Sequence, residues 1–234
     1  SAVQRPLYLA SNRYWLLGEQ GGPIDAHQTD PHALAEGIYE GSRHYFFSGN
    51  LLVKVFRLDH SQGERNRDEI EREATFLAHP PTGFHAPACR LFGLNRADTW
   101  LVRERLPGTL LLDHIRAGAA LDHDLILRAI LRQLIALETA GLYHSDLRTW
   151  NVLMTDDGQP VLLDYGSILR QPCDVAWPAN IYLSFFVFVS ELVSGKADVP
   201  EPLRSVTLGP WSLPAPYRAW AMALWESPLA TWSF

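Results

Sequence analysis

Three residues in one segment have the types and spacing that magnesium-assisted chemistry on a phosphate needs. The segment 141–168 reads GLYHSDLRTWNVLMTDDGQPVLLDYGSI and contains Asp146, Asn151 and Asp164. The oxygens of an Asn side chain and an Asp carboxylate are hard ligands that suit Mg²⁺, an ion that keeps few protein ligands when phosphates supply the others. We therefore expect Asn151 and Asp164 to bind Mg²⁺, and Asp146 to accept a proton from a substrate hydroxyl.

A short hairpin is predicted to bring two of these residues together. The apolar runs 152–154 and 161–163 flank a turn that contains Asp157-Gly158. An Asp-Gly pair between two β-forming runs is a hairpin signal. Pairing of the runs would place Asn151 near Asp164, although thirteen residues separate them in the sequence.

The elements around this segment are predicted from hydrophobic periodicity and from residues that end helices. Strands and one helix come first, and helices with the small hairpin follow. The predicted elements are a hairpin over 43–56, a helix over 63–79 that Pro80-Pro81 stops, a strand over 100–103, a long helix over 121–142 with Gly141 at its end, and a mostly helical remainder from near Pro178.

Length and composition indicate a folded protein with one large domain or two lobes. The chain has 234 residues, of which 47% are hydrophobic and 20% are charged.

The net charge of −6 argues against a nucleic-acid partner, because such binding usually needs a basic face. Cys89 and Cys173 leave a single disulfide open, but the favoured interpretation is two reduced thiols of a cytosolic protein. The longest apolar run, 181–189, is far shorter than the roughly 20 residues of a membrane span, so a soluble protein is expected.

The segment resembles the catalytic region of the protein-kinase superfamily. HSDLRTWNVL is similar to the pattern H-x-D-L-x-x-x-N, and DYG is similar to D-F-G. The resemblance implies that ATP binds between two lobes with Mg²⁺ on Asn151 and Asp164, and that Asp146 is the catalytic base. Arg148 stands where many kinases have a lysine that touches the γ-phosphate, so it is assigned to the transferred group.

The resemblance extends to the residues before this segment. Lys54 in LVKVF is similar to the strand lysine that contacts the α- and β-phosphates, with Glu73 as its ion-pair partner and Glu69 as the second choice. WLVRERLPG resembles the hinge, in which Glu104 and Leu106 would offer backbone groups to adenine.

The chain also departs from protein kinases in three places. Ser145 replaces the arginine of H-R-D, which implies that a phosphorylated activation loop is not read here. Only fourteen residues separate Asp164 from Pro178 and no A-P-E follows, so the acceptor is expected to be a small molecule or a sugar. A G-x-G-x-x-G loop is missing, and Gly41-Ser42 is the candidate for covering the phosphates, with Ser42 as a cofactor-binding residue.

Segments outside the catalytic loop point to a narrower family. They resemble the kinase domain of bacterial O-antigen chain terminators of the WbdD type, and they include QRPLYLASN, HPPTGFHAP, WLVRERLPGTLL, SFFVFVSEL and SPLATWSF. That family phosphorylates the non-reducing terminal mannose of a lipid-linked polymannose chain, and a methyltransferase domain then caps the phosphate. The resemblance implies a polymannose-type glycan acceptor. It also implies a fused or associated methyltransferase and a mannosyltransferase polymerase as partners.

The resulting prediction is an α+β, bilobal protein-kinase-like fold with a small β-rich N-lobe and a mainly helical C-lobe that has a short activation segment. Residues 1–40 are assigned to an irregular lead-in, 41–106 to the N-lobe and hinge, and 107–234 to the C-lobe. A cytoplasmic location is expected, with peripheral association at the cytoplasmic face of the inner membrane through partners as its extension.

Two alternatives stay open from the sequence. The chain could be another small-molecule or lipopolysaccharide-core sugar kinase, since these share the H-x-D…N…D pattern. It could also be a non-catalytic pseudokinase module, which the missing Gly-rich loop favours and the retained Lys54, Asp146, Asn151 and Asp164 oppose. Taken singly, Lys54 and Glu73 are more ordinarily solvated surface charges, His144 a packed core histidine and Arg148 an exposed loop residue.

Overall fold

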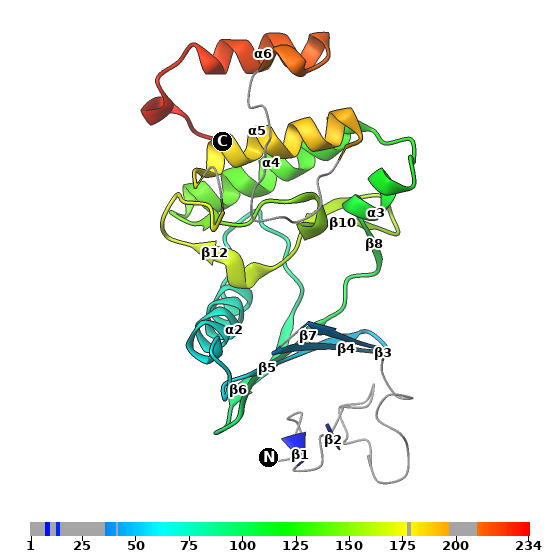
Figure 1. Cartoon of the computed structure of the whole chain (residues 1–234), viewed down its shortest axis with the longest axis vertical. Helices are drawn as coiled ribbons and strands as arrows, with labels where there is room; N and C mark the ends of the chain where they lie inside the picture. Colours follow the sequence, from blue (N-terminus) through cyan, green and yellow to red (C-terminus); the bar gives the residue numbers. More distant parts are fainter. Residues whose placement is uncertain (1–7, 10–12, 15–35, 41, 177–178, 197–209) are drawn as a thin grey trace. The chain divides into compact units, whose positions relative to one another are not determined.

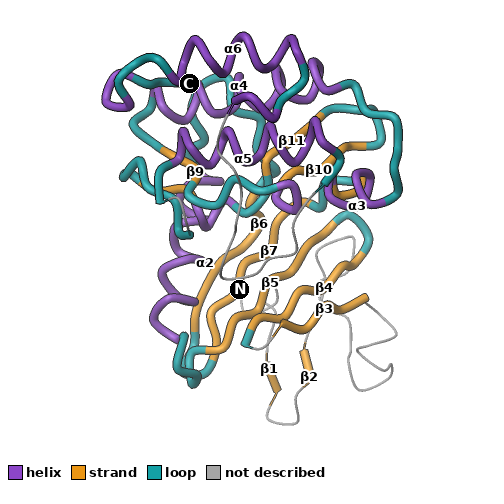
Figure 2. The backbone as a smooth tube through the Cα atoms, turned by 45° about the horizontal axis from the view of Figure 1, so that its top comes forward, coloured by secondary structure: helices purple, strands orange, loops and turns teal. Residues whose placement is uncertain are grey.

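The computed structural model describes residues 8–9, 13–14, 36–40, 42–176, 179–196 and 210–234. The chain divides into two compact units. The first unit consists of Ser1–Pro80 with Ala86–Leu106, and the second consists of Pro81–His85 with Pro107–Phe234. Strands dominate the described part of the first unit, and helices dominate that of the second (Figures 1 and 2).

The first unit is built on a five-stranded antiparallel sheet with the order β3-β4-β5-β7-β6 (Figure 2). Its strands are β3 (Glu36–Glu40), β4 (Arg43–Ser48), β5 (Leu51–Arg57), β6 (Cys89–Leu94) and β7 (Asp98–Glu104). The hairpin predicted over 43–56 is present as β4 and β5, and the strand predicted over 100–103 is the centre of β7.

Four strands of the first unit were not predicted as such. β3 lies inside the segment 1–40 that the sequence assigned to an irregular lead-in, and β6 was not predicted at all. β1 (Tyr8–Leu9) and β2 (Arg13–Tyr14) form a separate two-stranded pair in the same segment. β6 was missed because its side chains do not alternate between apolar and polar: Phe92 and Leu94 are apolar but exposed, and Gly93 stands at a half-buried position.

Alternation along β5 separates its apolar and charged side chains. Val53 and Val55 join a cluster with Phe46, Trp100 and Val102. Successive side chains of a strand point to opposite faces, so Lys54 lies on the other face of the sheet. That face meets α2 (Gly63–Ala78), since the Lys54 ammonium contacts a carboxylate of this helix.

Helix α2 packs its apolar stripe as the sequence pattern predicted. Ile70, Ala74 and Leu77 are buried at helical spacing, and the helix ends at Ala78, just before Pro80-Pro81. The first position of the helix requires glycine, because a Cβ on residue 63 would lie 2.1 Å from the carbonyl oxygen of Leu58.

The second unit is organised around α4 (His123–Thr139) and α5 (Ile181–Ser194), which run side by side (Figure 1). Asp122 caps α4 by accepting a hydrogen bond from the N–H of Leu125, and Asn180 caps α5 by accepting from the N–H groups of Tyr182 and Leu183. The short α3 (Leu111–Arg116) precedes α4, and α6 (Ala215–Trp225) follows α5.

Small strands position the segment between α4 and α5. β10 (Val152–Thr155) and β11 (Pro160–Leu162) form the predicted hairpin, with Val152 opposite Leu162, and β8 (Gly108–Leu110) pairs with the other edge of β10. β9 (Tyr143–His144) pairs with β12 (Ile168–Leu169), so the chain returns to the same place before and after the hairpin.

The start of the last helical part differs slightly from the prediction. The helix expected from near Pro178 begins at Ile181, and Trp177 and Pro178 themselves lie outside the described residues. Across the described residues, we find no helix whose length and apolar character would let it cross a membrane.

Candidate functional site

The first unit holds a buried ion-pair network around Glu73. The Lys54 Nζ lies 2.5 Å from Glu73 Oε2, and the Arg103 Nε lies 3.2 Å from Glu73 Oε1. Glu73 is fully buried, and Lys54 and Arg103 are each 4% exposed. Of the two glutamates considered from the sequence, Glu73 therefore contacts Lys54, while Glu69 pairs with Arg43. A buried carboxylate that holds two cations fixes the position of both.

Arg103 belongs to this network although sequence reasoning did not single it out. Leu52 lies opposite Arg103 in the β5–β7 ladder, and Leu52 is two residues from Lys54. Residues two apart share a face of a strand, so Arg103 and Lys54 share the face that meets α2. The sequence placed Arg103 in the predicted strand 100–103. Its contact with Glu73, however, follows only from the register between β5 and β7.

Two predicted nucleotide-binding positions have contacts of their own. The Glu104 carboxylate pairs with Arg90 and accepts from the N–H of Ala88 at 3.2 Å, and the Glu104 carbonyl accepts from Arg103 Nη1 at 3.0 Å. The backbone N–H of Glu104 donates to the carbonyl of Ala88 at 3.0 Å. Leu106 follows the end of β7 and is half-buried.

The assignment of Ser42 to phosphate binding needs correction. The Ser42 side chain is 8% exposed, and its hydroxyl accepts a hydrogen bond from Asn66 Nδ2 of α2 at 3.0 Å. The Ser42 carbonyl accepts from the N–H of Arg57 at 2.8 Å. A buried serine that ties a turn to a helix supports the fold of this unit and does not present its hydroxyl to a phosphate.

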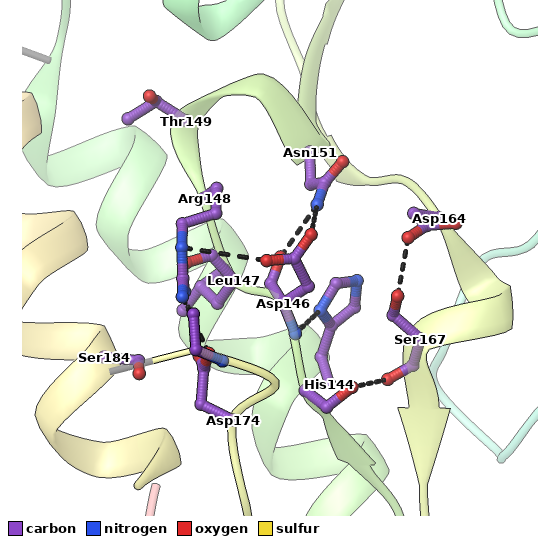
Figure 3. Close-up of polar contacts among 12 residues, drawn as sticks. His144, Asp146, Leu147, Arg148, Thr149, Asn151, Asp164, Ser167, Asp174 and Ser184 are labelled. Carbon is purple, nitrogen blue, oxygen red and sulfur yellow. Dashed lines mark hydrogen bonds and ion pairs between the residues drawn. The ribbon is translucent and has the colours of Figure 1, made fainter. Parts of the chain in front are cut away.

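In the second unit, His144 is the anchor of the loop that carries Asp146 (Figure 3). His144 is 2% exposed, and its Nε2 lies 2.7 Å from the carbonyl oxygen of Leu163. The backbone N–H of Asp146 donates to His144 Nδ1 at 3.3 Å. His144 is therefore a packed core histidine, as the sequence suggested. Its ring holds the start of the Asp146 loop against the end of the hairpin.

Asn151 fixes the carboxylate of Asp146. The Asn151 Nδ2 donates both to Asp146 Oδ2 at 2.9 Å and to the Asp146 carbonyl at 2.8 Å (Figure 3). Burial, as the largest cause, raises the pKa of Asp146 above its ordinary value, and the charge of Arg148 opposes this rise. A carboxylate whose pKa is raised is a better proton acceptor in a transfer reaction.

The hairpin brings Asp164 beside Asn151, as predicted. The N–H of Leu163 donates to the carbonyl of Asn151 at 2.8 Å, so the pairing of β10 and β11 continues to the residue before Asp164. Asp164 has a left-handed backbone with φ +60°, and its Oδ2 accepts from the Ser167 hydroxyl at 2.6 Å. A non-glycine residue in this conformation carries local strain, and such strain is typically found at functional sites.

The donor set of these two residues fits Mg²⁺. The Asn151 nitrogen is committed to Asp146, so the other branch of the same amide carries the oxygen that could serve as a ligand. Asp164 adds a carboxylate oxygen. In the described part of the chain, no group of three or more His, Cys, Asp or Glu side chains could hold a metal ion. Two oxygen ligands suit Mg²⁺ when phosphates and water complete its shell.

Ser145 and Ser167 connect the two halves of this site, and sequence reasoning missed the second of them. The Ser145 hydroxyl and N–H both donate to the Ser167 carbonyl, at 2.7 and 2.9 Å. The Ser167 hydroxyl in turn donates to Asp164. The serine in the place of the H-R-D arginine therefore ties the Asp146 loop to the segment that follows Asp164.

Arg148 differs from both interpretations drawn from the sequence. It is 2% exposed, so it is not an exposed loop residue. Its guanidinium donates to Asp174, from Nη1 to Oδ2 at 2.8 Å and from Nη2 to Oδ1 at 2.7 Å. Burial disfavours its charge, but the bonds to Asp174 and the charge of Asp174 outweigh this and raise its pKa. A guanidinium held in this way does not reach out to a phosphoryl group, and the predicted contact with the transferred group is corrected.

Comparisons with known proteins identify relatives of this chain. No model of a known protein family matches the chain. The chain is 40% identical to the O-antigen chain terminator bifunctional methyltransferase/kinase WbdD of Escherichia coli, over an alignment of 241 residues that covers 100% of this chain and 34% of WbdD. The chain therefore spans about a third of the length of this curated relative.

Solved structures of WbdD have the same fold. A low-resolution structure with an ordered C-terminal bundle has a TM-score of 0.76 and 39% identity, and the match covers 83% of this chain and 42% of that one. A structure of WbdD with a kinase inhibitor has a TM-score of 0.66 and 38% identity, and the match covers 83% and 41% of the two chains. The predicted α+β, protein-kinase-like fold class is confirmed.

Proposed function

Because the chain belongs to the family of WbdD-type O-antigen chain terminators, we propose that it is a Mg²⁺-ATP-dependent phosphotransferase that acts on a sugar hydroxyl. The proposed acceptor is the terminal mannose at the non-reducing end of a lipid-linked O-antigen polysaccharide, and phosphorylation would terminate its elongation. The E. coli relative is a bifunctional methyltransferase/kinase by name, which supports a kinase activity for this chain. The observation that carries the proposal is the Asp146 carboxylate, which Asn151 holds beside Asp164.

In the first unit, Lys54 would bind the α- and β-phosphates of ATP. The buried contact with Glu73 supports this role, because it holds the ammonium group in one place before the nucleotide arrives. Where β7 ends, the backbone of Leu106 and the Glu104 carbonyl, which has a second lone pair besides the one that accepts from Arg103, would contact adenine. The structure of WbdD with a kinase inhibitor supports a nucleotide site in that relative.

In the second unit, Asp146 would orient the acceptor hydroxyl and take its proton. The hydroxyl oxygen attacks the γ-phosphorus, a new O–P bond forms, and the bond to the oxygen that bridges the β- and γ-phosphates breaks to release ADP. The proton of the hydroxyl moves to the Asp146 carboxylate, whose raised pKa supports this role. Catalysis of this reaction consists mainly of positioning and charge stabilisation.

Asn151 and Asp164 would hold the magnesium ion. When bound, Mg²⁺ neutralises charge on the phosphate oxygens. The bond from Ser167 to Asp164 fixes one carboxylate oxygen of that residue and supports a defined direction for the other.

The proposed partners are those of a chain terminator. A fused or associated methyltransferase would cap the new phosphate, and a mannosyltransferase polymerase would supply the polymannose acceptor. The reaction would take place in the cytoplasm, at the cytoplasmic face of the inner membrane, with association through these partners.

A direct test measures phosphate transfer to a short mannose oligosaccharide. The wild-type protein is incubated with the oligosaccharide, ATP and Mg²⁺, and mass spectrometry detects the phosphorylated sugar. Asp146→Asn removes the proton acceptor with little change of shape and is expected to abolish transfer while ATP still binds. Asp156→Asn is the matched control, because Asp156 is an exposed residue of the hairpin turn and its replacement is expected to leave transfer unchanged. Chelation of Mg²⁺ with EDTA is expected to stop the reaction.

Each other outcome points to a different function. Bound or hydrolysed ATP without a phosphorylated mannose product would move the acceptor to another sugar or small molecule. Failure to bind ATP at all would favour a non-catalytic module. Full transfer by Asp146→Asn would contradict the role of Asp146.

A further inference from the structure

The segment after Asp164 returns to the catalytic loop and is bonded to it at several points. The N–H of Val175 donates to the carbonyl of Ser145 at 2.8 Å. Asp174, the preceding residue, pairs with Arg148 and also accepts from the N–H of Ala176 through Oδ1 at 2.9 Å. Asp174 is thus held in a local turn while its carboxylate receives both arms of the Arg148 guanidinium (Figure 3).

Arg148 connects this turn to the proposed base. Its Nη1 also donates to the carbonyl of Leu147 at 2.7 Å, and its Nε lies 3.7 Å from Asp146 Oδ1. The Asp174 side chain is fully buried and the Arg148 side chain is 2% exposed, whereas the Asp146 side chain is 23% exposed. Of these three charged groups, only Asp146 is therefore presented to a substrate.

The Asp146 carboxylate is consequently held from both sides. Asn151 donates to Oδ2, and Arg148 faces Oδ1. A guanidinium is stable in a buried position only when a partner of opposite charge and good geometry accepts its donors. Asp174 is that partner, because its two oxygens receive parallel hydrogen bonds from Nη1 and Nη2.

We propose that Asp174 is a positioning residue for Asp146, acting through Arg148, and that this buried pair fixes the carboxylate in the direction of the acceptor hydroxyl. The proposal rests on the proposed function, in which Asp146 takes the proton of that hydroxyl. It gives Arg148 a task other than contact with the transferred phosphate, because both terminal nitrogens of its fork are occupied by the protein.

Two variants separate this role from its alternatives. Asp174→Asn keeps the shape of the side chain but removes the charge that pairs with the guanidinium. Arg148→Lys keeps a positive charge but removes the planar fork and the Nε that faces Asp146. Because a lysine binds phosphate well as a point charge, Arg148→Lys would preserve activity if residue 148 contacted the transferred group.

The experiment measures kcat and the KM for ATP in phosphate transfer to the mannose oligosaccharide, with Kd for ATP measured separately. Both variants are expected to lower kcat by about 10- to 100-fold, in line with the cost of a misplaced catalytic group. The KM and Kd for ATP should change less than about twofold, since a misdirected base leaves nucleotide binding intact. Glu138→Gln is the structural control, because Glu138 ties α4 to Tyr182 and Phe234 instead of the catalytic loop. It is expected to lower stability while kcat per folded molecule stays at the wild-type value.

The outcomes decide between positioning and simple structural support. Wild-type kcat in either variant would overturn the proposal. So would a parallel loss of ATP binding and kcat that follows the folded fraction.

A second measurement holds even if the proposed function fails. The NMR signal of the Arg148 Nε–H group is expected to shift in both Asp174→Asn and Asp146→Asn, because Arg148 contacts both carboxylates. If wild-type protein transfers no phosphate but this signal shifts in both variants, the proposed function is wrong and the connection between Asp174 and Asp146 stands. An Arg148 signal that does not shift in Asp146→Asn would overturn the proposed connection between Asp174 and Asp146.

Discussion

Replacing Asp98 by asparagine is expected to stabilise the fold, because the carboxylate of Asp98 is buried without a partner. Asp98 begins β7 and is 1% exposed. Neither of its side-chain oxygens has a hydrogen-bond partner within the described part of the chain. Burial is the largest cause that raises the pKa of Asp98 to about 6; the charge of Arg57 opposes the rise and that of Asp59 adds to it.

The size of the effect follows from this pKa. The rise from 3.8 to about 6 corresponds to about 3 kcal/mol of penalty on the ionised form in the folded state. Because the folded pKa lies above the unfolded one, the folded state binds the proton more tightly between these two values. The contribution of Asp98 to the free energy of unfolding therefore falls as pH rises through this window, and the full penalty is present above pH 6.

Asparagine keeps the polar shape without the charge. Its own buried amide carries a smaller cost, so we expect Asp98→Asn to raise the free energy of unfolding by about 1–3 kcal/mol at pH 7.5. At pH 4.5 the carboxyl of wild-type Asp98 is largely protonated in the folded state. The advantage of the variant should then be smaller by about 2 kcal/mol.

Urea unfolding followed by tryptophan fluorescence at the two pH values tests this expectation. Taking the difference between variant and wild type cancels the other groups that titrate. Asp68→Asn is the matched control, because Asp68 lies exposed on α2, and its replacement should change stability by less than about 0.5 kcal/mol at either pH. The reasoning would be refuted if Asp98→Asn were no more stable than wild type at pH 7.5. It would also be refuted if the variant exceeded the wild-type free energy of unfolding by the same amount at both pH values.

Two further changes test the packing of each unit. Glu73→Gln removes the carboxylate that pairs with two buried cations. We expect the free energy of unfolding in urea to fall by about 3–5 kcal/mol and ATP binding, measured by calorimetry, to weaken. Glu64 is exposed, so Glu64→Gln is expected to change neither quantity. Gly108→Ala places a Cβ 2.2 Å from the carbonyl oxygen of Met154 at φ +147° and should lower the melting temperature. The matched Gly118→Ala has φ +63° and open space, so equal effects of the two substitutions would show that the steric clash is unimportant.

The parts of the fold that the sequence predicted are those decided by local pattern. The hairpin of β4 and β5, the helices α2 and α4, and the hairpin of β10 and β11 each depend on periodicity and on turn residues within one short segment. The short β3 and β6 carry a weak pattern of their own. They are strands because the strands that follow them in the chain, β4 and β7, supply their hydrogen bonds, and the pattern within each short segment does not reveal this pairing.

The same distinction applies to the candidate site. Asp146, Asn151 and Asp164 were found because a loop of five residues and one hairpin bring them together. Arg103 escaped notice, since its contact with Glu73 depends on the register between β5 and β7. Ser167 escaped for another reason. A serine three residues after an aspartate is not a recognisable motif. The Ser167 hydroxyl reaches the Asp164 carboxylate because the backbone of Asp164 is left-handed, which the sequence does not reveal.

Arg148 shows why position in a motif is weaker evidence than the chemistry of the surroundings. Its place in HSDLRTWN suggested a contact with phosphate, because the sequence alone does not show whether a cation beside the proposed base is buried. Once the side chain is buried, its charge must be compensated within the protein. Asp174, which lies 26 residues away, provides the compensation with two parallel bonds. In the proposed mechanism, Arg148 therefore acts on the substrate only through Asp146, and Asp174, in the segment after Asp164, helps to direct the proposed base.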